Sequence, residues 1–164
     1  MEGKRIMQTT RDQIIDALVA TYRELNTRVR PLEEAQLTAK AAATPSGLGA
    51  GAGASVHDIV ARMRNDELRF AQALKERITG VPMPDILEDD SPIIGTESED
   101  DTTAVLISQF GTARATTLTM LKGLSDEDWN TTVDEGKTIH DRVQELVSSD
   151  KRQLERIMQQ VAVK

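Results

Sequence analysis

Apolar residues recur at three- and four-residue intervals in four separate stretches of the chain. This interval places side chains on one face of an α-helix, so the pattern predicts helices at about residues 10–30, 55–79, 98–122 and 138–162. No stretch alternates apolar and polar residues over enough positions to indicate a strand. The predicted inward faces consist of Ile14, Leu18, Tyr22, Leu25 and Val29 in the first helix, Val56, Val60, Met63, Phe70, Leu74 and Ile78 in the second, Val105, Gln109, Ala113 and Met120 in the third, and Ile139, Val143, Leu146, Leu154, Ile157 and Val161 in the fourth.

Residue types that start or stop helices stand at the ends of these stretches. Thr9 or Thr10 can cap the first helix, Pro31 can end it, and Gly80 can end the second. The three connections are long enough to cross a helical bundle, so their lengths leave the topology open. The chain also has the length of one domain. The sequence therefore predicts an all-α protein, a four-helix bundle that forms a single domain over residues 1–164.

The second and fourth predicted helices begin with similar residues. Each starts with a Ser or Thr followed three residues later by Asp, a form of the capping box, in SVHD at residues 55–58 and TIHD at residues 138–141. Two caps that converged and an ancient duplication of a helical hairpin explain this similarity equally well. We expect His57 and His140 to be exposed in the first helical turns. The alternative, a paired metal site, requires both helices to start at the same end of the bundle.

Charge is distributed unevenly along the chain. The net charge is −7, but residues 85–101 carry eight acidic side chains and no basic one, so the rest sums to about +1. Outside this segment the chain is nearly neutral, so its charge would not attract nucleic acid, and four aromatic residues are too few for base stacking. We expect no nucleic-acid partner and read the acidic segment as a solvated linker.

The absence of some residue types narrows the chemistry further. The chain has no cysteine, which excludes disulfides, thiolate metal ligands and cysteine nucleophiles. It also lacks an apolar stretch of membrane-spanning length or a signal-like start, so we expect no membrane partner and a cytoplasmic protein. The glycine-rich GLGAGAGA at residues 47–54 lacks the following Lys-Ser/Thr of phosphate-binding loops, so it does not indicate a nucleotide site.

Two carboxylates fall inside the predicted apolar faces. At 100° per residue, Glu67 lies within the face of the second helix and Asp150 at the matching angle of the fourth. Gln153 shares that face and Ser149 lies at its margin. A buried carboxylate needs a cation or hydrogen-bond donors, and the available arginines are Arg11, Arg62 and Arg114. These residues form either buried ion pairs or a polar pocket in the bundle core.

The chain resembles DinB-like proteins in two segments. SVHDIVARMRNDELRFAQALKERI at residues 55–78 resembles the family's second helix, and LKGLSDEDWNTTVDEGKTIHDRVQELVSSDKRQLERI at residues 121–157 resembles its turn and fourth helix. The resemblance implies a four-helix bundle, often a homodimer, that holds one divalent ion through three histidines. It also implies that the second and fourth helices are antiparallel, which would put His57 and His140 at opposite ends.

The residues at the implied metal positions are Arg62, Ser149 and Gln153, and none of them is a histidine. The family's later glutamate is matched by Glu67. Serine and glutamine bind zinc or nickel poorly compared with the imidazole of histidine, and an arginine places a positive charge where the metal ion would lie. We therefore expect neither a bound metal nor another cofactor.

Two functions compete on these residues, and a third involves the acidic segment. The first is a metal-free ligand-binding or non-catalytic bundle. The second is a thiol-dependent transferase or isomerase, like some DinB-like relatives, in which Arg62 stabilises a thiolate and Glu67 or Asp150 acts as a base. The third is an interaction partner that binds through residues 85–101. The candidate ligand contacts are Arg62, Glu67, Ser149, Asp150 and Gln153.

Overall fold

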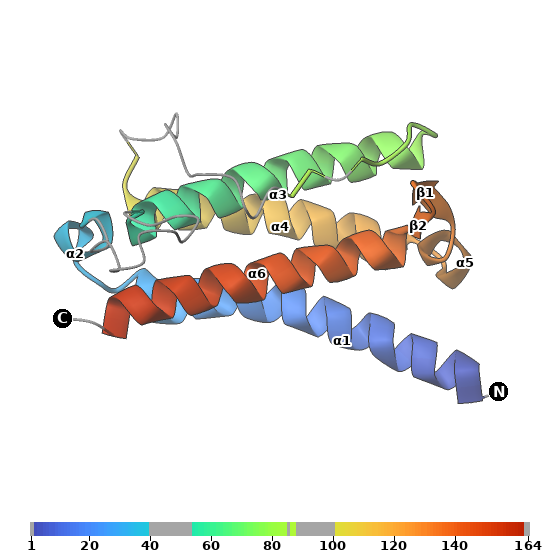
Figure 1. The fold of residues 1–164 in the computed structure, drawn as a ribbon, viewed down its shortest axis with the longest axis horizontal. Helices are drawn as coiled ribbons and strands as arrows, with labels where there is room; N and C mark the ends of the chain where they lie inside the picture. Colours follow the sequence, from blue (N-terminus) through green and yellow to red (C-terminus); the bar gives the residue numbers. More distant parts are fainter. Residues whose placement is uncertain (1, 40–53, 85, 88–100, 163–164) are drawn as a thin grey trace.

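The computed structural model describes residues 2–39, 54–84, 86–87 and 101–162, and most of these residues are helical (Figure 1). This confirms the prediction of a mostly helical chain. The helices are α1 (Glu2–Glu24), which continues as one π-helical segment η1 (Leu25–Val29), α2 (Glu34–Thr38), α3 (Val56–Ile78), α4 (Thr103–Gly123), α5 (Asp126–Trp129) and α6 (Ile139–Ala162). A short antiparallel pair of strands, β1 (Thr132–Asp134) and β2 (Lys137–Thr138), precedes α6.

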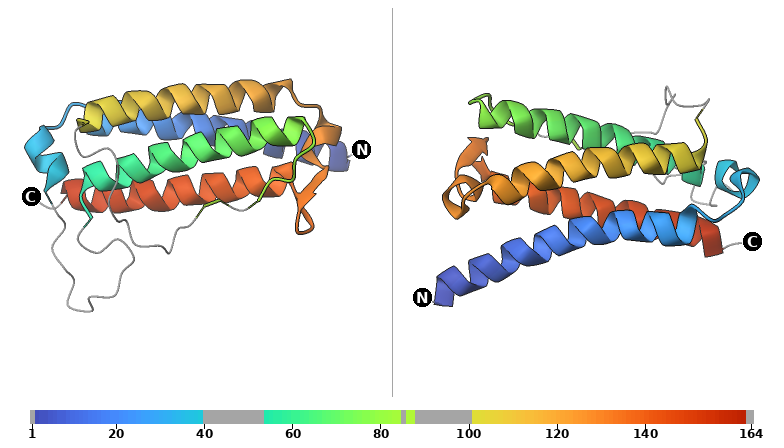
Figure 2. Two further views of the ribbon diagram at one scale, coloured as in Figure 1. Left: turned by 90° about the horizontal axis from the view of Figure 1, so that it is seen from above. Right: turned by 180° about the vertical axis from the view of Figure 1, so that it is seen from behind.

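Four long helices lie side by side (Figures 1 and 2). Helices α3 and α4 run in one direction, and α1 and α6 run in the opposite direction. His57 and His140 therefore stand in the first turns of antiparallel helices, α3 and α6, and lie at opposite ends of the molecule. This arrangement rules out a metal site shared by the two histidines.

The apolar core consists of two clusters, one at each end of the long helices. One cluster includes Leu25, Ile59 and Phe110, and the other includes Leu18, Leu74 and Trp129. Between them, four buried polar residues, one from each long helix, are joined by hydrogen bonds. This polar layer consists of Thr21 from α1, Glu67 from α3, Arg114 from α4 and Asp150 from α6.

The observed caps agree only in part with the expected ones. Capping boxes hold the starts of α3, through Ser55 and Asp58, and of α6, through Thr138 and Asp141. Helix α4 begins at Thr103, later than the expected residue 98, where the Thr102 hydroxyl accepts from the Val105 amide. Helix α1 begins at Glu2, before the expected threonine cap, so Thr9 and Thr10 lie within the helix.

The prediction of a chain without strands is wrong at residues 132–138. The β1–β2 hairpin turns through Glu135 (φ 49°) and Gly136 (φ 76°), and positive φ at both turn residues is typical of a type I′ turn. The strands have three and two residues, too short for an alternating pattern to appear in the sequence.

Three further expectations about side-chain exposure are wrong, and the first concerns Ile78, which lies at the end of α3 and is 52% exposed. In α4, Val105 and Gln109 are exposed, while the buried face contains Leu106, Phe110 and Arg114. His57 is 6% exposed, because its Nε2 lies 2.6 Å from the Asp101 carbonyl oxygen at the approach to α4.

Two predictions fall mainly outside the described residues. These are the glycine-rich segment at 47–54, except Ala54, and most of the acidic segment at 85–101. Within the described ranges, none of the helices combines the length and the apolar character needed to cross a membrane.

Candidate functional site

Arg114 is the centre of the polar layer: it bonds directly to Glu67 and Asp150, and Thr21 joins the layer through Asp150. Its Nη2 donates to Glu67 Oε1 at 2.8 Å and to Asp150 Oδ1 at 3.1 Å. Its Nη1 donates to Asp150 Oδ2 at 2.9 Å and to the Leu18 carbonyl oxygen at 2.8 Å. The Thr21 hydroxyl donates to the same Asp150 oxygen at 2.9 Å. The expected burial of Glu67 and Asp150 is confirmed, and the arginine that pairs with them is Arg114.

This layer contains two carboxylates and one guanidinium. Burial alone lowers the pKa of Arg114, but the charges of Asp150 and Glu67 outweigh burial and leave that pKa above its ordinary value. Burial raises the pKa of Asp150, the Arg114 charge opposes the rise, and the Glu67 charge adds to it. The Asp150 carboxyl therefore binds a proton more readily than the carboxyl of an exposed aspartate does.

The layer is closed to solvent. Glu67 is 0% exposed and Arg114 is 1% exposed. Glu67 Oε2 and Arg114 Nε have no hydrogen-bond partner among the described residues. A base that acts on a bound substrate must reach it, but Glu67 is fully buried and Asp150 is only 6% exposed. The geometry favours a structural role for Glu67 and Asp150.

The three positions implied by the DinB resemblance lie along the contact between α3 and α6. Ser149 and Gln153 are 5% and 2% exposed, one turn apart on α6. Arg156 Nη1 donates to Gln153 Oε1 at 3.2 Å. The Arg62 side chain is 11% exposed, and its Nε lies 3.8 Å from Asp66 Oδ2, so this ion pair is largely buried.

A second guanidinium joins Arg62 at this contact. The pKa of Arg156 is lowered, mainly by burial and further by the nearby positive charge of Arg62. We define Arg62, Ser149, Gln153 and Arg156 as the α3–α6 polar site. Its residues do not fit a divalent metal, because two guanidinium groups repel a cation and no imidazole or carboxylate stands at the implied ligand positions. The described part of the chain also has no cluster of three His, Asp or Glu side chains suited to a metal.

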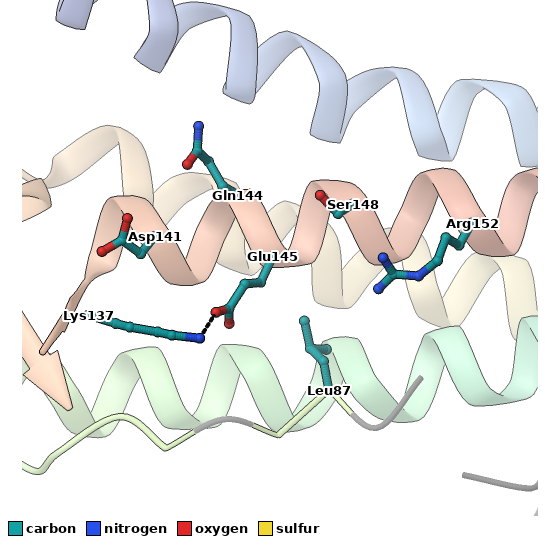
Figure 3. Close-up of a pocket in the computed structure, with 7 residues that line it drawn as sticks. All are labelled: Leu87, Lys137, Asp141, Gln144, Glu145, Ser148 and Arg152. Atoms are coloured by element: carbon teal, nitrogen blue, oxygen red, sulfur yellow. Dashed lines mark hydrogen bonds and ion pairs between the residues drawn. The ribbon is translucent and has the colours of Figure 1, made fainter. Parts of the chain in front are cut away.

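A surface cleft of about 630 Å³ lies along α6 (Figure 3). Figure 3 shows it between α6 and the segment that carries Leu87, with Ser148 and Arg152 on α6. Its carboxylates already have structural partners. Glu145 pairs with Lys137 and Arg142, and Asp141 caps α6, where the backbone hydrogen bond with Thr138 lowers the Asp141 pKa. None of the four residues of the α3–α6 polar site lines this cleft.

Sequence reasoning did not single out Thr21, Arg114 or Arg156 as site residues. Arg114 was only one of three possible partners for the carboxylates, and another of them, Arg11, pairs with Asp126 instead. A signal for Arg114 was present, because it is the only charged residue between Thr103 and Leu121. Thr21 and Arg156 carry no comparable signal.

Comparisons with protein-family models, curated proteins and solved structures return no match to this chain. The resemblance to DinB-like proteins therefore rests on the two segments at residues 55–78 and 121–157 alone.

Proposed function

We propose that this chain is a DinB-like four-helix bundle that works without a metal and binds a small molecule through an anionic group. The two resembling segments support the family, and the antiparallel course of α3 and α6 agrees with what the resemblance implies. The ligand-binding residues in this proposal are Arg62, Ser149, Gln153 and Arg156.

The observation that carries the proposal is a pair of guanidinium groups, Arg62 at an implied metal position and Arg156 near it. Arg156 is close enough to Arg62 for the Arg62 charge to lower its pKa. Like charges in a partly buried place disfavour each other, and an anion between or beside them relieves that cost. Arginine suits carboxylate and phosphate groups because its donors form a planar fork. The buried hydroxyl of Ser149 and the amide of Gln153 add uncharged polar groups to the site.

Calorimetric titration of the full chain with inorganic phosphate, malonate and glutathione tests this proposal. We expect at least one probe to bind, and Arg156→Gln to weaken its binding at least about tenfold, the scale of one charge-assisted contact. Arg28→Gln is the matched control, since Arg28 is exposed and pairs only locally with Glu24. The proposal fails if no probe binds or if Arg156→Gln binds as tightly as the control.

Elemental analysis tests the metal-free part of the proposal separately. We expect the dialysed protein to retain no stoichiometric zinc or nickel. About one ion per chain, lost in Ser149→Ala or Gln153→Ala, would contradict this expectation.

The thiol-dependent enzyme is the alternative, and the same arginine pair favours it. A guanidinium beside a bound thiol lowers its pKa and so promotes the reactive thiolate. The closed position of Glu67 and Asp150 argues against their use as the base. Turnover of an electrophile with glutathione separates the functions, because a binding protein shows no rate above the uncatalysed reaction.

A further inference from the structure

Another pocket lies at the end of the molecule where α3 ends, α5 packs and α6 begins (Figure 1). It has a volume of about 440 Å³, within the range of roughly 300–1,000 Å³ that is typical of small-molecule sites. We call it the α3–α5 pocket. It shares no residue with the α3–α6 polar site or with the cleft along α6, so it is a separate candidate site.

One wall of the α3–α5 pocket is apolar and consists of Ile78, Leu124 and Ile139. Ile139 is 4% exposed and belongs to the apolar cluster at this end of the molecule, so the wall continues the core. Ile78 is 52% exposed, although the helical period of α3 places it on the same face as Leu74. Covering such a side chain removes apolar surface from water, which favours a ligand with a hydrocarbon body.

The charged residues of the lining are Arg77 and Asp128, and they differ in how far they are already engaged. Asp128 forms a capping box in α5, where its Oδ2 accepts from the Ser125 backbone amide at 3.1 Å. Arg77 Nη2 donates to the Thr132 carbonyl oxygen at 3.5 Å, the upper limit for a hydrogen bond. Among the described residues, no carboxylate forms an ion pair with Arg77. A ligand carboxylate can therefore bind this guanidinium without displacing an internal partner.

The hydroxyl groups of the lining are already bonded within the chain. Thr79 Oγ1 donates to the Glu76 carbonyl oxygen at 2.6 Å, and Thr131 Oγ1 donates to the Glu127 carbonyl oxygen at 2.9 Å. The part of a ligand that lies beyond Arg77 therefore needs no hydrogen-bonding group of its own.

We propose that the α3–α5 pocket binds an apolar monocarboxylic acid. The carboxylate binds the Arg77 guanidinium, and the hydrocarbon part packs against Ile78, Leu124 and Ile139. This ligand differs from the one proposed for Arg62 and Arg156, because it needs an apolar body and only one cation. The inference does not depend on the function proposed for the α3–α6 polar site.

Calorimetric titration with heptanoate, heptanol and heptylamine tests the ligand class, because these probes share a chain length and differ in the polar group. Heptanoate should bind at least about tenfold more tightly than either of the others, the scale of one charge-assisted contact. From pentanoate to heptanoate, each added methylene should strengthen binding about fourfold. No binding of heptanoate, an affinity that does not change with chain length, or tighter binding of heptylamine would overturn the proposal.

Single substitutions test the position of the ligand. Arg77→Gln should weaken heptanoate binding at least about tenfold, and Ile78→Ser should weaken it about fourfold or more. Lys75→Gln is the matched control, because Lys75 is an exposed cation near the end of α3 that does not line the pocket. Circular dichroism checks that each variant remains folded. The proposal fails if Arg77→Gln binds heptanoate as tightly as Lys75→Gln does.

Arg156→Gln separates this pocket from the α3–α6 polar site. It should still bind heptanoate with the wild-type affinity, since Arg156 does not line the α3–α5 pocket. Loss of heptanoate binding in Arg156→Gln but not in Arg77→Gln would place the carboxylate at the other site and overturn the inference. Failure of phosphate, malonate and glutathione to bind would leave the heptanoate result unaffected, so the two proposals can fail independently.

Discussion

Replacing Arg114 with methionine is the most direct test of the polar layer. Methionine keeps a long, unbranched apolar side chain but removes the charge and all four side-chain hydrogen bonds to Glu67, Asp150 and the Leu18 carbonyl. The two carboxylates then remain buried without a cation. Removing one partner of a buried ion pair typically costs ~3–5 kcal/mol, and we expect a loss of that size in the free energy of unfolding at pH 7.

The three partners of this layer should differ in a definite order. Asp150 accepts three hydrogen bonds and Glu67 accepts one, so Asp150→Asn should cost more than Glu67→Gln, with Arg114→Met costing most. For Glu67→Gln we expect ~1–3 kcal/mol, the scale of one disrupted buried contact. The triple variant that neutralises all three residues should recover most of the loss of Arg114→Met, because no unpaired charge remains buried.

Urea unfolding followed by the fluorescence of Trp129 measures these differences. Trp129 is 2% exposed and becomes solvated when the chain unfolds. If Arg114→Met lies within about 1 kcal/mol of wild type at pH 7, the layer does not contribute through charge pairing. A triple variant no more stable than Arg114→Met would contradict the same reasoning.

Three smaller predictions concern single positions. Because the pKa of Asp150 is raised, the Asp150 carboxyl binds a proton more tightly in the folded chain than in the unfolded chain. The free energy of unfolding should therefore fall as pH rises above about 4. Urea titrations of Asp150→Asn should not show this fall. Gly136→Ala should lower the free energy of unfolding by about 1 kcal/mol, because Gly136 has a positive φ. Gly123→Ala has open space around the new Cβ atom, so thermal unfolding should show it to be neutral or stabilising. Gly111→Ala should lower stability by ~1–3 kcal/mol, since its Cβ would lie 2.4 Å from the Tyr22 ring, and a melting temperature equal to wild type would refute that contact.

The long helices were predictable because their inward faces repeat with the helical period over many turns. In the first and fourth predicted helices, residues such as Leu18, Val29, Val143 and Ile157 are buried as expected. The third helix shows the limit of this reasoning. Its outward residues from Ala104 to Met120 carry no charge of their own, so periodicity alone placed Val105 on the inward side.

The partner of the carboxylates was harder to predict than their burial. An angle on a helical wheel places Glu67 on a face of its own helix, but it does not say which helix lies opposite. Helix α3 packs closely against α4, so Arg114 of α4 forms an ion pair with Glu67, and Arg62 pairs with Asp66 in its own helix. The β1–β2 hairpin was missed for a different reason, because its only sequence signal is the Glu135-Gly136 pair.

The order in which the ribosome makes the polar layer has a consequence for folding during synthesis. Thr21, Glu67 and Arg114 emerge before Asp150, so the growing chain first holds one carboxylate and one guanidinium, a neutral pair. Docking of α6 then completes the hydrogen bonds of Arg114 but brings a second negative charge into the interior. The last long helix must therefore dock mainly through apolar residues such as Val143, Leu146 and Ile157, and shortening these side chains should prolong the nascent chain's exposure to chaperones.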